Sequence, residues 1–297
     1  MSGKNINAWV IHLTRIDLPV LRKTAQEIER MRKIEDRITA RDISSVILHD
    51  PMMTIKVLRF IESRRKTETT EITTISHALM MMGTGSFFEH FSKFEIIEDL
   101  LADQPVALAG MLSVISRSRH AALYAQDWSI LHHDLESDEV TIAALLHDMA
   151  EMLLWCYSPN HLVEIRRRMM RDSTLRSLDT QQAVLGFDLL KLQLLLAAVW
   201  KLPSLLRSLM DTNHAHLPRV VNVNLATALA RHSANGWHNA ALPDDYAAIN
   251  AFLNIGEEGV MQNINRNALF AAREWKWCNY RPAAAWFPLL PGEWPVV

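Results

Sequence analysis

The chain has 297 residues, enough for one large domain or two small ones, and 49% of them are hydrophobic and 22% charged. This composition is typical of a globular protein and excludes extensive disorder. The formal charge of -2, from 31 basic and 33 acidic residues, creates no overall field that attracts nucleic acid, so nucleic-acid binding is not expected.

Targeting and redox signals are weak. No apolar signal core follows the N-terminus, and no apolar run reaches the roughly 18 residues of a membrane span, so we expect a cytoplasmic protein without membrane contact. Cys156 and Cys278 are far apart and neither belongs to a Cys-x-x-Cys pair. This spacing predicts two buried thiols and argues against a disulfide framework or a zinc ribbon.

Apolar residues recur at helical spacing along the first third of the chain. Thr39 and Asp42 have the spacing of a capping box, and Pro51 suits the first turn of a helix. A helix over residues 75–82 should end at Gly83, and a polar break at Asp103-Gln104-Pro105 closes this part. We therefore expect an N-terminal helical subdomain over residues 1–102.

The remaining chain also has helical patterns, and strand patterns are nearly absent. A long helix is expected from residue 106 to about residue 131, followed by shorter helices that form a core over residues 103–236. Residues 237–297 change character, because Trp, Pro and Gly gather after residue 277 and exclude a regular helix there. We expect this C-terminal extension to lie over the body, with its aromatic rings in surface grooves. The sequence thus predicts an all-α fold.

The most uniformly apolar helical run covers residues 143–155 and has His147 and Asp148 at its centre. A helix that is apolar on nearly every face belongs in the middle of a domain. The two polar side chains then need partners, which could be a metal ion, a charged side chain or hydrogen bonds.

Several short motifs occur in the order and spacing of one bacterial family. They are Leu18-Pro19, His49-Asp50-Pro51, Ile75-Ser76-His77-Ala78-Leu79, Leu145-Leu146-His147-Asp148-Met149 and Trp200-Lys201-Leu202-Pro203. Over residues 18–210 the chain resembles the HDOD family, signalling proteins related to the HD and HD-GYP metal-dependent phosphohydrolases. The resemblance implies an N-terminal helical bundle packed on an HD-like helical core. It also implies a non-enzymatic signal-transduction or scaffold module that acts on signalling proteins in trans.

The resemblance also locates the positions where active HD relatives bind their metal ion. Three of these positions carry Arg117, Leu189 and Asn224, and neither arginine nor leucine can donate a lone pair to a metal. His147 and Asp148 then remain as a vestigial pair, and the resemblance implies no catalytic residue, metal or cofactor. If Arg117 faces Asp148, its guanidinium replaces the ion as the countercharge.

An alternative interpretation keeps an enzymatic role. His120, one turn beyond Arg117, and His214, which with His216 precedes the late helix, could complete a metal site. The protein would then be a divergent metal-dependent HD phosphohydrolase acting on a nucleotide or another phosphodiester.

A basic cluster offers a further candidate site. An anionic nucleotide second messenger could bind there, and nucleic acid is a weaker alternative because the net charge is close to zero. A solvated face balanced by nearby acids is the simpler interpretation. The cluster consists of Arg166, Arg167, Arg168 and Arg171. The sequence predicts neither the identity of a protein partner nor an oligomeric state.

Overall fold

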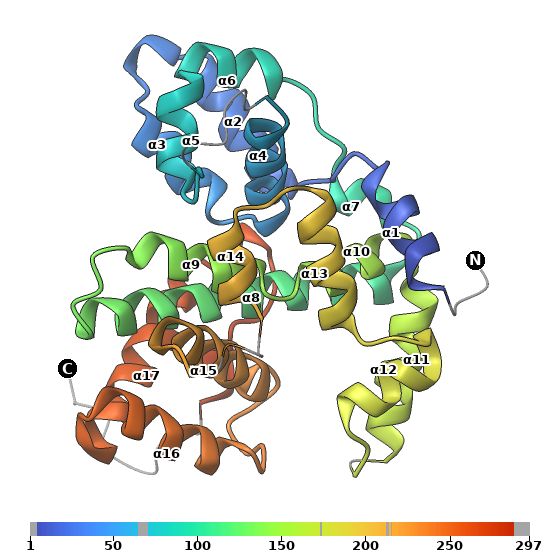
Figure 1. Ribbon diagram of the computed structural model, residues 1–297, viewed down its shortest axis with the longest axis vertical. Helices are drawn as coiled ribbons and strands as arrows, with labels where there is room; N and C mark the ends of the chain where they lie inside the picture. The colour runs from blue at the N-terminus through green and yellow to red at the C-terminus, as the bar shows by residue number, and fades with distance from the viewer. Residues whose placement is uncertain (1–4, 65–70, 173, 212–213, 215, 288–297) are drawn as a thin grey trace, which may run out of the picture.

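The computed structural model describes residues 5–64, 71–172, 174–211, 214 and 216–287. Within these residues every regular element is a helix, apart from one isolated parallel bridge between Val20 and Ile96. The prediction of an all-α fold is therefore confirmed. Figure 1 shows an N-terminal lobe above a central layer that contains the long helix α8, with two further groups of helices below it.

The N-terminal lobe follows its capping signals. Thr39 and Asp42 form the predicted capping box, in which Thr39 Oγ1 accepts from the Asp42 N–H at 3.2 Å and Asp42 Oδ2 accepts from the Thr39 N–H at 2.9 Å. Gly83 ends α5 with a φ of 80°, which glycine adopts at little cost. Figure 1 shows α1 and α7 beside α13 and α10, apart from the lobe of α2 to α6, and α1 packs against α13. The elements of this part of the chain are α1 (Ile6–Thr14), α2 (Arg22–Arg32), η1 (Glu35–Arg37), α3 (Ala40–Ile47), α4 (Pro51–Arg64), α5 (Ile75–Met82), α6 (Thr84–His90) and α7 (Ile97–Leu100).

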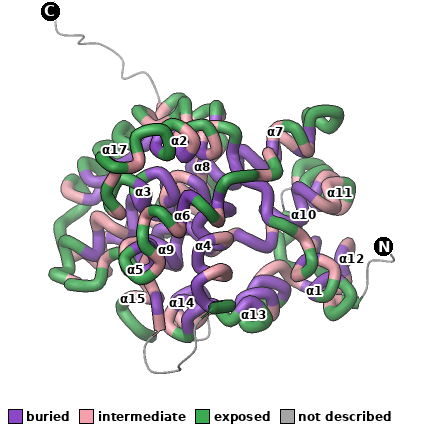
Figure 2. The backbone as a smooth tube through the Cα atoms, turned by 90° about the horizontal axis from the view of Figure 1, so that it is seen from above, coloured by how far each residue is buried: buried purple, intermediate pink, exposed green. Residues whose placement is uncertain are grey.

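The core is built around α8, which packs against α9, α10, α15 and α17. Figure 2 shows α8, α9 and α4 as largely buried segments in the interior of the molecule. Gly110 on α8 allows close packing, because a Cβ atom there would lie 2.6 Å from the Trp155 ring. The core helices are α8 (Pro105–Leu131), α9 (Ser137–Leu146), α10 (Met149–Tyr157), α11 (Pro159–Arg171), α12 (Ser177–Leu185), α13 (Leu189–Val199), α14 (Ser204–Leu209) and α15 (Pro218–Ser233).

The prediction of one helix over residues 143–155 is wrong. Helix α9 ends at Leu146 and α10 begins at Met149, so His147 and Asp148 form the turn between two helices. Asp148 has φ -107° and ψ 24°, outside the helical region. The break is local, because Ser137–Tyr157 is not among the helix pairs bent by more than 40°, and it places both polar side chains in a turn where they reach residues of other helices.

This pair of helices also corrects the expectation about apolar runs. Ser137–Tyr157 is long and apolar enough to cross a membrane by length and composition alone. However, 78% of its apolar window is buried inside the fold, as in the core helix of a soluble protein.

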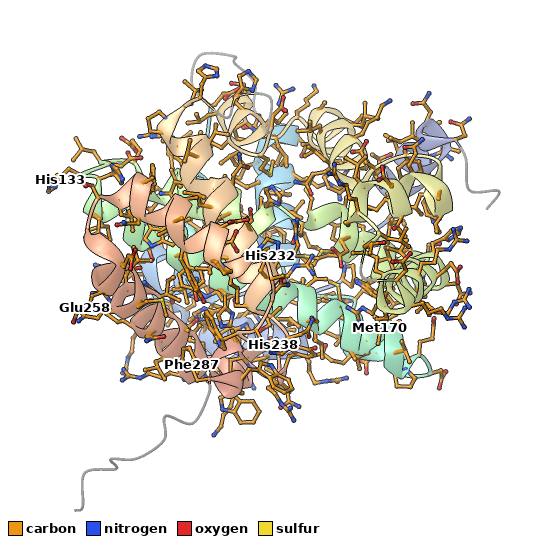
Figure 3. The ribbon with its side chains drawn as sticks, turned by 90° about the horizontal axis from the view of Figure 1, so that it is seen from below. His133, Met170, His232, His238, Glu258 and Phe287 are labelled. Carbon is orange, nitrogen blue, oxygen red and sulfur yellow. The ribbon has the colours of Figure 1, made fainter. Side chains whose placement is uncertain are left out.

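The C-terminal extension packs on the body through some of its aromatic rings. Trp277 stacks on His49 with ring centroids 4.1 Å apart, and its Nε1 donates to Thr24 Oγ1 at 3.2 Å. Within the extension itself Phe287 stacks on Trp237, and Figure 3 shows Phe287 on the same side of the molecule as His238. The part of the extension beyond residue 287 lies outside the described residues. The elements are α16 (Leu242–Leu253), α17 (Gly256–Arg273), η3 (Trp275–Trp277) and η4 (Ala283–Trp286).

Candidate functional site

A cavity of about 960 Å³ opens at the corner formed by His147 and Asp148. Helices α8, α10 and α15 contribute its polar end, and α11, α12 and α13 contribute a wall rich in leucine and methionine. This volume is at the upper end of the range for small-molecule sites in proteins. The cavity is therefore the candidate functional site of the chain.

Arg117 lies at the centre of the polar end. Its Nε donates to Asp148 Oδ2 at 2.8 Å, and its Nη2 lies 2.7 Å from the same oxygen and also donates to Glu151 Oε2. The side chains of Arg117 and Asp148 are only 12% and 13% exposed. Burial alone would lower the pKa of Arg117, but the two carboxylates raise it above its ordinary value. The predicted contact between Arg117 and Asp148 is thus present, and Glu151 extends it.

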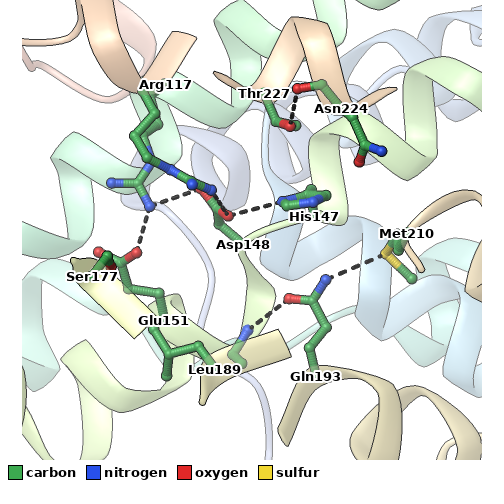
Figure 4. A network of polar contacts seen from close by, with 12 residues as sticks. Arg117, His147, Asp148, Glu151, Ser177, Leu189, Gln193, Met210, Asn224 and Thr227 are labelled. Atoms are coloured by element: carbon green, nitrogen blue, oxygen red, sulfur yellow. Dashed lines mark hydrogen bonds and ion pairs between the residues drawn. The ribbon is translucent and has the colours of Figure 1, made fainter. Parts of the chain in front are cut away.

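The second oxygen of Asp148 is also engaged. His147 Nδ1 lies 3.0 Å from Asp148 Oδ1, and Arg231 Nη2 approaches the same oxygen at 3.3 Å, as Figure 4 shows for His147. Burial would raise the pKa of Asp148, but Arg117, Arg231 and His147 together lower it well below its ordinary value. Asp148 is therefore a carboxylate whose charge is compensated by arginine side chains.

The residues at this corner do not fit a divalent metal ion of the HD type. An ion bound by His147 and Asp148 would have to displace the Arg117 guanidinium from Asp148 Oδ2. Two protein ligands fall short of the three that catalytic sites usually provide. Across the described part of the chain, no group of three or more His, Cys, Asp or Glu side chains is arranged to hold a metal.

The histidines considered as additional ligands lie elsewhere. His120 is 5% exposed, its Nδ1 lies 2.8 Å from the Ser116 carbonyl, and it faces small cavities beneath the C-terminal extension. His214 is 46% exposed and lies 3.6 Å from Asp211, next to His216. The structure does not bring His120 or His214 to His147, because their side chains face other parts of the molecule.

Leu189 and Asn224, the two other positions expected to have lost a metal ligand, have different surroundings. Leu189 begins α13 and lines the cavity, where its N–H donates to Gln181 Oε1 at 2.9 Å. Asn224 lies on α15 and accepts a hydrogen bond from Thr227 Oγ1 through its main-chain carbonyl (Figure 4). The residue of α15 that reaches Asp148 is Arg231, seven positions further along the helix.

Sequence reasoning missed Glu151 and Arg231. Glu151 is three residues from Asp148, so the helical spacing of α10 offered a signal for it. Arg231 is 83 residues away from Asp148, and no local pattern connects them.

The arginine cluster does not act as one patch. Arg167 and Arg168 both pair with Glu164, each through an Nε at 2.7 Å, and this matches the simpler interpretation of a balanced surface. Arg171 is exposed at the end of α11. Arg166 turns toward the cavity, where its guanidinium lies 4.9 Å from the centroid of the Trp155 ring.

Comparisons with solved structures show that this fold is shared. One crystal structure is the MmoQ response regulator from Methylococcus capsulatus str. Bath, with 18% identity, a TM-score of 0.65, and coverage of 84% of this chain and 98% of that chain. Another is a virulence factor from Campylobacter jejuni subsp. jejuni, with 18% identity, a TM-score of 0.63, and coverage of 89% of this chain and 99% of that chain. At such identities the likeness concerns the fold and leaves function open.

Sequence comparison identifies the family directly. No curated protein sequence matches the chain. The HDOD domain family model matches residues 18–216, which is more than half of the chain and includes the cavity corner at His147 and Asp148. The chain therefore belongs to the HDOD domain family.

Proposed function

We propose that this protein is a non-enzymatic signal-transduction or scaffold module of the HDOD type. The observation that carries the proposal is the position of Arg117, whose guanidinium lies against both Asp148 and Glu151. A cation that is part of the chain compensates the carboxylates where an HD phosphohydrolase would need an exchangeable metal ion. Without that ion the site has no means of generating a hydroxide nucleophile by metal coordination.

The proposed mode of action is binding of signalling proteins in trans, in the cytoplasm. Family membership supports this role, as does the fold likeness to MmoQ, which is itself described as a response regulator. The cavity supports control by a small ligand, because its volume of about 960 Å³ suits a molecule of the size of a nucleotide second messenger. In this proposal the ligand is a signal and is not converted to a product.

The test is elemental analysis of the purified protein before and after incubation with Mn, Fe or Zn and dialysis. We expect much less than one metal equivalent per chain, the same content in the Asp148→Ala variant, and no hydrolysis of bis-p-nitrophenyl phosphate. About one equivalent that is lost in Asp148→Ala, together with hydrolysis that is lost in His147→Ala, would overturn the proposal. That result would establish the divergent phosphohydrolase in its place.

A further inference from the structure

The polar end of the cavity has more positive than negative charge. Three guanidinium groups, those of Arg117, Arg166 and Arg231, line the cavity together with the carboxylates of Asp148 and Glu151, and Lys191 and Asp188 add one charge of each sign. Arg117 already pairs with both Asp148 and Glu151. One positive charge at this end therefore lacks a carboxylate counterpart.

Arg231 and Arg166 are the groups available to a ligand. Among the described residues Arg231 makes one ion pair, at 3.3 Å through Nη2, and its side chain is 48% exposed. Arg166 lies over the face of Trp155 and has no carboxylate partner in the described part of the chain. Since a guanidinium carries five N–H donors in a planar fork, both side chains can bind an anionic oxygen without breaking the Arg117 contacts.

The opposite wall of the cavity is mainly apolar and partly exposed, although Gln181, Asp188 and Lys191 also line it. Leu178 on α12 is 61% exposed and Met170 on α11 is 81% exposed, and both line the cavity. Leu190 and Leu194, one turn apart on α13, are half-buried and line it as well. Figure 3 shows Met170 at the periphery of the molecule, at the opposite end from His133. Aliphatic side chains in a concave wall gain free energy when an apolar ligand covers them.

We infer that the cavity binds an amphipathic organic anion, a carboxylate on an unbranched aliphatic chain. The carboxylate lies between Arg231 and Arg166, and the aliphatic chain runs along the leucine and methionine side chains of α11, α12 and α13. This inference rests on the proposed function, because it treats the cavity as a signal-binding site and names the class of signal.

The two halves of the cavity together favour this class over other small molecules. An uncharged aliphatic ligand would cover the apolar wall but leave the surplus arginine charge desolvated without a partner. A nucleotide would bring several phosphate charges to an end that has one surplus positive charge, and its sugar would lie against leucine and methionine. A carboxylate with an aliphatic chain satisfies both ends.

Isothermal titration calorimetry with octanoate, decanoate and laurate below their micelle concentrations tests the inference. We expect saturable binding at one site per chain, with an affinity that rises about three- to fourfold for each added methylene. Dodecanol should bind at least tenfold more weakly than laurate, because it leaves the arginine charge unpaired. GMP and inorganic phosphate should show no saturable binding.

Variants separate the contribution of the arginine side chains that bind the carboxylate from that of the apolar wall. Arg231→Gln should weaken laurate binding at least tenfold and leave dodecanol binding unchanged, whereas Leu190→Asn should weaken both. Arg273→Gln removes an exposed arginine on α17 and serves as the matched control, with laurate binding unchanged. Urea unfolding of each variant checks that the fold is retained, and two variants on different helices keep the test decisive if one of them fails to fold.

Several outcomes would overturn the inference. They are the absence of saturable laurate binding, equal laurate binding by Arg231→Gln and wild type, and tighter binding of GMP than of laurate. Binding to phosphatidylglycerol vesicles without binding of monomeric laurate would also overturn it, because the anion would then belong to a lipid surface. Metal analysis of the same samples keeps the two proposals distinct. If the protein is free of metal and does not bind laurate, only the inferred ligand class is refuted. If it holds one metal ion per chain and hydrolyses the phosphodiester, the proposed function itself is refuted.

Discussion

Replacing Arg117 by methionine removes the countercharge and keeps an unbranched side chain of similar length in the core. The Asp148 and Glu151 side chains, 13% and 21% exposed, would then lose their shared partner. Removing one partner of a buried ion pair costs about 3–5 kcal/mol, because the remaining charge is uncompensated. Arg231 remains 3.3 Å from Asp148, so we expect Arg117→Met to lower the free energy of unfolding by about 3 kcal/mol at pH 7.

The effect should depend on pH. In the wild type the pKa of Asp148 is lowered well below its ordinary value, so its stabilising contribution is present above the unfolded-state pKa and is lost as the pH falls through the folded-state pKa. In Arg117→Met, burial dominates and raises the pKa of Asp148, so protonation relieves the cost at mildly acidic pH. The difference between wild type and variant should therefore be largest at pH 7 and should shrink toward pH 4.

Urea unfolding followed by tryptophan fluorescence, at several pH values, measures this difference by linear extrapolation. The control is Arg167→Met, which removes a surface contact with Glu164 and should change stability by no more than the error of the measurement. Adding Asp148→Asn to Arg117→Met should recover part of the loss, since the unpaired charge is then absent. A loss below about 1 kcal/mol at pH 7, or an equal loss at every pH, would refute the argument that Arg117 compensates a buried charge.

Two further predictions concern packing and the C-terminal extension. Gly110→Ala places a Cβ atom 2.6 Å from the Trp155 ring. The overpacking should cost about 1–3 kcal/mol and outweigh the gain of about 1 kcal/mol in helix propensity, so we expect a lower Tm in calorimetry. An unchanged or higher Tm would contradict the close packing at Gly110. Burial opposes ionisation of Glu274, but contacts from His49 and Arg119 lower its pKa to about 2. Its contribution is therefore present above the unfolded-state pKa of about 4.5 and is lost as the pH falls toward 2. Glu274→Gln should lower the free energy of unfolding in urea more at pH 6 than at pH 3. An equal loss at both pH values would show that the ion pairs of Glu274 with His49 and Arg119 do not stabilise the fold.

Helix ends could be predicted where the signal is local. The Thr39 and Asp42 capping box and the glycine stop at Gly83 each depend on residues within one turn of the boundary. The break at Asp148 could not be predicted in this way, because apolar residues on both sides continue one helical pattern. Packing of α9 and α10 against α8 accompanies that break, and such long-range contacts leave no trace in a window of a few residues.

The site shows the same division between local and long-range information. The expectation that Arg117 replaces a metal ion predicted the contact between Arg117 and Asp148, because a buried carboxylate requires a countercharge. His120 lies three residues from Arg117 and was expected to share its surroundings. Three residues correspond to a rotation of about 60° around a helix, and in α8 this rotation directs His120 toward two small cavities beneath the C-terminal extension, only one of which Arg117 also lines. A sequence pattern cannot distinguish these two directions without the packing partners of α8.

In the proposed function Arg117 takes the place of a metal ion, and this exchange also changes what the site can respond to. A bound ion can leave when its concentration falls, whereas the guanidinium is covalently part of α8, so its attraction for Asp148 contributes to folding and is always present. The part of the cavity that can still respond is therefore the part that Arg117 does not occupy, where Arg231 on α15 and Arg166 on α11 have incomplete sets of partners. A ligand that binds both side chains connects two helices that the fixed ion pair leaves independent. In our proposal a signal received at the cavity acts through that connection, because Asp148 already has its countercharges.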